Sequence, residues 1–173
     1  MATDLKESPG SRKRPRGVFD RGVVLATADI AEAPERIFRA LTTDEVERWW
    51  GSADTYRMTG WTANLRVGGR WSVVVRGVDG SVNPTSGQFL EIDPPRKVMH
   101  TRKYEWEHPT LGGQETMVTY TLEPIPTGTR VVVRHEGFVG RRTAGEEHVE
   151  GWVRVLGWLE AYMRGPTALD AVR

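Results

Sequence analysis

Residues 143–165 read TAGEEHVEGWVRVLGWLEAYMRG and carry the longest helical pattern in the chain. Apolar residues recur along it at spacings of three and four, as they do on one face of an α-helix. These residues are Val149, Trp152, Val153, Leu156, Leu159 and Met163. Gly165 and Pro166 then predict the end of the helix, because proline cannot continue it.

Two glycines, Gly151 and Gly157, lie inside this helical pattern. Each costs about 1 kcal/mol relative to alanine in a helix interior. They either permit close packing of a strand or leave room for a ligand beside Trp152.

Most of the chain before this helix alternates with the period of a β-strand. A first strand is expected from Gly22 onward, in VVLATADI, and six more follow from residue 61. Those six read WTANLRV, GRWSVVVRG, TSGQFLEI, RKVMHTRKYEW, ETMVTYTLEP and GTRVVVRHEGF. Short turns such as Asp79-Gly80 separate them, which favours antiparallel pairing. The sequence therefore predicts an α+β fold in which a seven-stranded antiparallel sheet curves around the long C-terminal helix.

Two short helices are expected directly after the first strand. Pro34 opens one of them, because the fixed φ of proline suits a first helical turn. Thr42 and Glu45 have the spacing of a capping box and predict the start of the second. The adjacent Trp49 and Trp50 lie on the apolar face of that second helix.

The composition fits one globular domain. The chain has 173 residues, of which 38% are hydrophobic, and a formal net charge of +1. No run of about 18 apolar residues predicts a membrane span, and residues 1–17 lack the apolar segment of a secretory signal. Cysteine is absent, which excludes disulfides and makes the cytoplasm the expected location. Seven of the fifteen aromatic residues are tryptophan, which often lines places that are apolar yet partly wet.

Residues 1–21 differ in composition from the rest. They hold six basic and three acidic residues and almost no apolar periodicity, so we expect a disordered basic tail. The short cluster RKRPR is a weak signal for nucleic-acid binding, and we expect a solvated tail without a nucleic-acid partner. The predicted domain then covers residues 22–165, and residues 166–173 form a C-terminal tail.

Strand alternation assigns side chains to the two faces of the predicted sheet. In the last strand, charged residues mark the solvent side, so His135 points inward. In RKVMHTRKYEW the same rule turns His100, Arg102 and Tyr104 inward. A buried arginine without a partner would cost several kcal/mol, on the order of the penalty for burying any unpaired charge. Three explanations stay open: the strand is bulged, the polar groups meet a carboxylate, or they face a wet cavity.

Five segments of the sequence occur in the order and spacing of a known family. They are APERIFRALTTDEVERWWG, LRVGGRW, GQFLEIDPPRKV, LEPIPTGTRVVVRHEGF and GWVRVLGWLEAYM. Over roughly residues 22–164 the chain resembles SRPBCC (START-like) domains, and within them the branch named after the C-terminal domain of the activator of heat-shock protein 90 ATPase. The resemblance implies the helix-grip fold, with a hydrophobic cavity between the sheet and the long helix.

The same resemblance implies several functions. Many SRPBCC domains bind lipids, hormones or polyketides, and aromatic polyketide cyclases and aromatases use the cavity for catalysis. This chain reads VMHTR where a strand like LVYTW is expected, so His100 and Arg102 stand where aromatic residues are common. Since the arginine fork suits a carboxylate or phosphate, we expect a ligand that is polar or anionic at one end.

Our leading hypothesis is a non-enzymatic domain that binds a small apolar or amphipathic molecule, without cofactor or metal. The residues expected around its cavity are Trp50, Trp71, His100, Arg102, Tyr104, Tyr120, His135 and Trp152. The resemblance also implies that the short helix with both tryptophans lies at the pocket entrance, and we expect Trp50 to line the pocket and Trp49 to be structural.

Two alternatives stay open beside this hypothesis. One is a cyclase-like enzyme in which His135, His100 and Tyr104 perform acid–base chemistry. The other is a protein-interaction module that engages a chaperone or forms a homodimer. The segment HEGF at His135 lacks the second histidine of a zinc-binding HExxH motif, so we expect no metal there.

Overall fold

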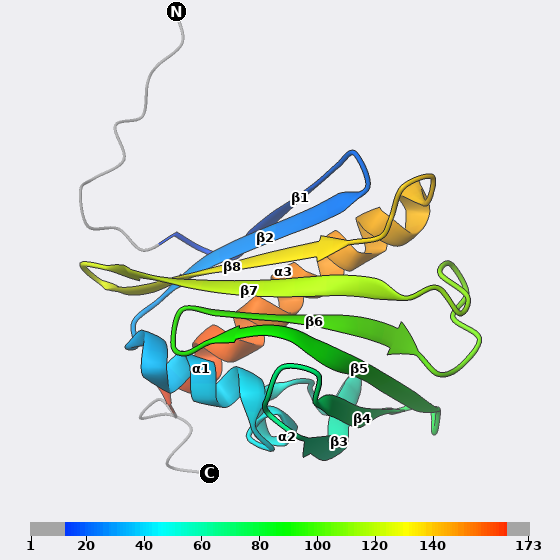
Figure 1. The fold of residues 1–173 in the computed structure, drawn as a ribbon, viewed down its shortest axis with the longest axis horizontal. Helices are drawn as coiled ribbons and strands as arrows, with labels where there is room; N and C mark the ends of the chain where they lie inside the picture. The colour runs from blue at the N-terminus through cyan, green and yellow to red at the C-terminus, as the bar shows by residue number, and fades with distance from the viewer. Residues whose placement is uncertain (1–12, 166–173) are drawn as a thin grey trace, which may run out of the picture.

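The computed structural model describes residues 13–165 (Figure 1). In chain order the elements are β1 (Arg16–Asp20), β2 (Val23–Ile30), α1 (Pro34–Thr42), α2 (Val46–Trp49), β3 (Tyr56–Ala63), β4 (Arg70–Gly77), β5 (Val82–Asp93), β6 (Lys97–Tyr104), β7 (Thr116–Ile125), β8 (Gly128–Glu136) and α3 (Arg142–Arg164). Within this part of the chain no helix is long and apolar enough to cross a membrane.

One curved antiparallel sheet holds the fold together. Among the described residues it has eight strands, in the order β1-β2-β8-β7-β6-β5-β4-β3. Figure 1 shows α3 crossing behind the sheet, with α1 and α2 at the lower left and α2 beside β3, against which it packs. The predicted α+β helix-grip architecture is therefore confirmed, with a long C-terminal helix and two short helices after the first predicted strand.

The expected strand count of seven was wrong by one. The additional strand, β1, lies within residues 1–21, which were expected to form a disordered tail. Residues 1–12 of that tail lie outside the described part of the chain. β1 pairs with β2 from Arg16↔Thr27 to Asp20↔Val23. The turn between them consists of Arg21 and Gly22, both with positive φ (48° and 80°), as in a two-residue hairpin. The expected C-terminal tail, residues 166–173, also lies outside the described residues.

Contacts with α3 explain why β1 is ordered despite its charges. Gly17 faces α3 so closely that a Cβ on it would lie 3.0 Å from a methyl group of Val149 and 3.2 Å from one of Val153. Two residues on, the ring of Phe19 lies against Gly145, where any Cβ would collide with it. An inward-facing glycine adds no apolar signal to the strand pattern, which is why alternation alone did not reveal β1.

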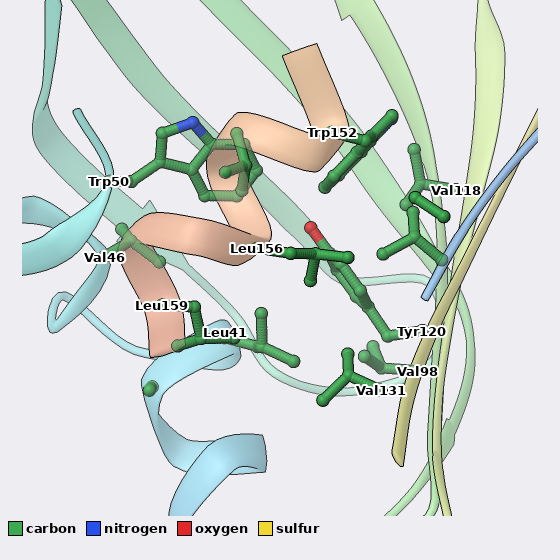
Figure 2. Close-up of a cluster of buried hydrophobic side chains, with 14 of the residues drawn as sticks. Leu41, Val46, Trp50, Val98, Val118, Tyr120, Val131, Trp152, Leu156 and Leu159 are labelled. Atoms are coloured by element: carbon green, nitrogen blue, oxygen red, sulfur yellow. The ribbon is translucent and has the colours of Figure 1, made fainter. Parts of the chain in front are cut away.

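The core forms where α3 meets the inner face of the sheet. Figure 2 shows Trp152, Leu156 and Leu159 of α3 opposite Val98, Val118 and Val131 of three strands, all of them buried. The inward assignment of His135, His100 and Arg102 is also confirmed, with exposed fractions of 0%, 7% and 8%. Because these three are polar, their partners decide whether they are structural or functional.

The predicted capping box at the start of α2 was wrong. The Thr42 hydroxyl donates back to the Phe38 carbonyl at 2.7 Å, so it ends α1 instead of capping α2. The Glu45 carboxylate is bound by the Arg36 guanidinium and accepts a hydrogen bond from the Tyr162 hydroxyl at 2.7 Å. This network ties both short helices to the last turns of α3.

Candidate functional site

Two pockets on the inner side of the sheet share Trp50 and Arg102 in their walls. The deeper one, between the sheet and the short helices, has a volume of about 20 Å³, which is room for little more than one water molecule. The wider one, between the sheet and α3, has a volume of about 190 Å³. Side chains therefore largely fill the deeper pocket and leave open space in the wider one.

All eight residues that the sequence indicated for a ligand site line one or both of these pockets. The deep pocket is lined by Trp71, His100 and Tyr120, the wide pocket by Tyr104, His135 and Trp152, and both by Trp50 and Arg102. The structure thus brings the eight expected residues together, but they line two pockets instead of one cavity.

Arg102 is the most unusual residue of the site. Its side chain is buried, and within residues 13–165 no carboxylate lies within ion-pair distance of it and its Nε has no hydrogen-bond partner. Its guanidinium carbon lies 5.6 Å from the ring centre of Trp50, 5.9 Å from that of Trp71 and 5.5 Å from that of Tyr104. Such cation–π contacts stabilise the charge in part, yet they leave the N–H donors of the guanidinium without an anion.

A chain of hydrogen bonds fixes the backbone at Arg102. The indole N–H of Trp152 donates to Nδ1 of His135 at 3.0 Å, so the proton of the neutral ring is on Nε2. That Nε2 lies 2.7 Å from the hydroxyl of Thr116, which in turn donates to the Arg102 carbonyl at 3.2 Å. Both ring nitrogens of His135 are therefore engaged, which gives this histidine a structural role.

Burial keeps His135 and His100 neutral. It lowers the pKa of His135 well below its ordinary value, and the neighbouring His148 and Arg102 lower it further. It also lowers the pKa of His100 to about 4, although the backbone of Thr101 favours the charged form. In His100, Nδ1 donates to the Thr101 carbonyl at 2.9 Å, and the ring meets Trp71 edge-on at 4.9 Å. At neutral pH neither ring adds positive charge beside Arg102.

His148 and His108 belong to the site although the sequence reading did not include them. Nε2 of His148 lies 2.9 Å from the Tyr104 hydroxyl, and Nδ1 lies 2.7 Å from the Ala144 carbonyl. The His108 ring stacks on Tyr104 at 4.7 Å between ring centres. A signal for His148 was present, since it precedes Trp152 by four residues and so shares its helix face. His108 lies in a loop, where no pattern assigns a direction.

The two adjacent tryptophans have different surroundings. The Trp50 ring lies 5.6 Å from Trp152 and beside Arg102, where it lines both pockets. The Trp49 indole N–H donates to the Ala40 carbonyl at 3.0 Å, and its side chain is buried outside both pockets. In Figure 2 the Tyr120 hydroxyl points toward the side on which Trp50 and Trp152 lie.

Gly151 contributes open space to the wide pocket. A Cβ placed on it would meet no atom within 4 Å, and the residue lines the pocket one position before Trp152. Gly157 has equally free surroundings but lines neither pocket. Gly151 therefore agrees with the explanation that a glycine leaves room beside Trp152. Neither Gly151 nor Gly157 packs closely against a strand, so the other explanation applies to neither of them.

No metal centre is apparent in the described part of the chain, where His, Asp and Glu side chains form no group of three that could hold an ion. The arrangement offers a buried cation, aromatic walls, a tyrosine hydroxyl and, in the wall of the wide pocket, the Glu147 carboxylate, which accepts a hydrogen bond from the Thr110 hydroxyl at 3.0 Å.

Comparison with known proteins places this arrangement in context. A family model described as Activator of Hsp90 ATPase homolog 1-like protein matches residues 32–164. A solved structure from Rhodobacter sphaeroides has a TM-score of 0.75 at 19% identity, covering 88% of this chain and 100% of that one. One from Arthrobacter aurescens has a TM-score of 0.75 at 23% identity, covering 87% and 92%. The AHSA1 protein from Silicibacter pomeroyi has a TM-score of 0.67 at 25% identity, covering 82% and 97%. No curated protein sequence matches.

Proposed function

Because the chain belongs to the family of activator of Hsp90 ATPase homolog 1-like proteins, we propose that it binds a small amphipathic molecule. The anionic end of this ligand contacts Arg102, and its apolar body lies in the wide pocket.

The unpaired guanidinium of Arg102 carries the proposal. A buried charge without a counterion is costly, and charged groups in such surroundings are frequent at functional sites, where a ligand can supply the counterion. Arg102 is 8% exposed and lines the wide pocket. A carboxylate or phosphate matches the fork of its N–H donors.

The walls of the wide pocket suit an apolar ligand body. Trp50, Tyr56, Trp152 and Val155 contribute aromatic and aliphatic surface, and Gly151 leaves open space beside Trp152. Ligand sites commonly combine such walls with a few polar anchors. The small volume of about 190 Å³ favours a ligand with a short chain or a single ring.

Binding has more support than the cyclase alternative. That alternative needs a histidine that can exchange a proton with the ligand. Both ring nitrogens of His135 are engaged, and His100 lines only the deeper pocket of about 20 Å³. Neither histidine has the surroundings of a general base for a ligand in the wide pocket.

Titration of tryptophan fluorescence with octanoate and with octan-1-ol tests the proposal. These probes share an alkyl chain and differ in charge. We expect octanoate to bind at least about 10-fold more tightly, as a charge-assisted hydrogen bond predicts. Arg102→Gln should remove this preference, and failure of octanoate to bind would contradict the proposal.

A pair of glycine variants tests the location. Gly151→Leu places a side chain in the wide pocket and should abolish binding of both probes. Gly157→Leu, on the same helix, places the same side chain outside both pockets and should leave binding unchanged. Equal effects of the two variants would contradict the assignment of the pocket.

A further inference from the structure

The hydrogen bonds of His148 determine which of its nitrogens carries the proton. Nδ1 lies 2.7 Å from the Ala144 carbonyl, which can only accept a hydrogen bond. Nδ1 is therefore protonated. Burial, which outweighs the bond to Ala144, lowers the pKa of His148 to about 4, so the ring is neutral at pH 7. Nε2 is consequently left with a lone pair.

This proton position fixes the direction of the Tyr104 hydroxyl. Nε2 of His148 lies 2.9 Å from the Tyr104 oxygen and must accept the phenolic proton. A phenol has one proton, so the remaining capacity of the Tyr104 oxygen is as an acceptor. The ring itself is held by stacking on His108, with 4.7 Å between centres and 20° between planes. Tyr104 thus presents an acceptor to the wide pocket, which it lines.

Arg102 and Tyr104 stand next to each other on the inner face of β6. They are two residues apart on one strand, and the guanidinium carbon lies 5.5 Å from the Tyr104 ring centre. Against the effect of burial, the Tyr104 hydroxyl helps to hold the pKa of Arg102 above its ordinary value, in part through a side-chain hydrogen bond, so the Tyr104 oxygen lies beside the guanidinium to which the anion would bind. The pair combines a donor fork for the anion with an acceptor beside it.

We propose that Tyr104 determines specificity by selecting ligands that carry a hydroxyl group near the anionic end, so that the preferred ligand class is a small hydroxy acid. The inference rests on the proposed anion binding at Arg102 and deepens it. His148 is a positioning residue, because it acts on the ligand only through the hydroxyl of Tyr104. A ligand carbonyl at the same place would face the lone pairs of Tyr104 and gain no hydrogen bond.

Four eight-carbon acids that share a chain test the inference. They are octanoate, 2-hydroxyoctanoate, 3-hydroxyoctanoate and 2-oxooctanoate, with each enantiomer of the hydroxy acids titrated separately by tryptophan fluorescence. We expect one hydroxy acid to bind at least about 5-fold more tightly than octanoate, the effect of one net hydrogen bond. The oxo acid should bind no more tightly than octanoate, because it can only accept.

Tyr104→Phe is the decisive variant, since it keeps the ring and its stacking and removes only the hydroxyl. We expect the hydroxy acids to lose their advantage, so that they and octanoate bind Tyr104→Phe with equal affinity. Equal affinities of the wild-type protein for octanoate and every hydroxy acid would overturn the inference, as would a preference that persists in Tyr104→Phe. If octanoate does not bind at all, the proposed function fails, and the inference fails with it.

The ring nitrogens of His148 provide a second readout that does not depend on any variant. Nitrogen-15 NMR of the ligand-free protein should show a protonated Nδ1 and an unprotonated Nε2 at pH 7. The opposite tautomer would make Tyr104 a donor and would overturn the proposed selection.

Discussion

Replacing Arg102 by methionine and replacing Arg130 by methionine should change the stability of the protein in opposite directions. Arg102 is buried without a carboxylate among the described residues, whereas Arg130 donates two hydrogen bonds, of 2.8 and 3.0 Å, to Asp29. Asp29 is itself 3% exposed. Methionine has a similar length to arginine and carries no charge, so Arg→Met removes the charge and retains much of the packing.

The expected magnitudes follow from these surroundings. A buried charge costs several kcal/mol, and three desolvated cation–π contacts recover roughly 2–4 kcal/mol of it. We therefore expect Arg102→Met to raise the free energy of unfolding of the ligand-free protein by about 1–3 kcal/mol. For a chain of this size, each kcal/mol raises Tm by roughly 2–4 °C. Arg130→Met leaves the Asp29 carboxylate buried without its ion-pair partner and should lower the free energy of unfolding.

Urea unfolding followed by far-ultraviolet circular dichroism measures both changes, since this signal reports mainly on the backbone and less on the tryptophans beside Arg102 than fluorescence does. The buffer must lack carboxylates and phosphate, because a bound anion would stabilise the wild-type protein alone. A loss of more than about 1 kcal/mol in Arg102→Met would refute the reasoning. It would mean that the aromatic contacts compensate the charge fully and that Arg102 is retained for stability.

Three further predictions concern the stability of the fold. The hydrogen bonds from its arginine partner hold the pKa of Asp29 below its ordinary value. This ion pair therefore stabilises the protein above about pH 4 and loses its effect as the pH falls through the lowered pKa. Wild type and Asp29→Asn should thus differ most in urea unfolding at about pH 6, above the unfolded-state pKa, and converge as the pH falls through the lowered pKa. A difference that stays constant with pH would contradict this. Trp152→Phe leaves Nδ1 of the buried His135 unpaired and should lower the free energy of unfolding by about 1–3 kcal/mol in the same assay. An unchanged free energy would argue against the hydrogen-bond chain. Gly157→Ala should raise stability by about 0.5–1 kcal/mol and Gly145→Ala should lower it, and thermal shifts of equal sign would contradict the described packing.

Strand alternation was sufficient to place the polar residues of β6. His100 and Arg102 share the inner face because side chains alternate along a strand, whatever their polarity. The same rule placed His135 inward. Pattern alone could not separate their roles, because these depend on partners from other elements, such as Trp152 for His135.

Two features depend on three-dimensional packing and could not be read from local patterns. β1 is held by contacts of Gly17 with Val149 and Val153, residues more than 130 positions away in the sequence. The division of the expected cavity into two pockets results from the positions of Trp50 and Arg102, whose side chains lie between them. Side-chain packing of this kind has no signature in the spacing of residues.

A crystal structure of the protein with bound octanoate tests the central claim most directly. We expect the carboxylate within hydrogen-bond distance of the Arg102 guanidinium and the alkyl chain between Trp50 and Trp152, beside Gly151. Octanoate bound outside the wide pocket, or bound with its carboxylate directed to solvent and away from Arg102, would contradict the account.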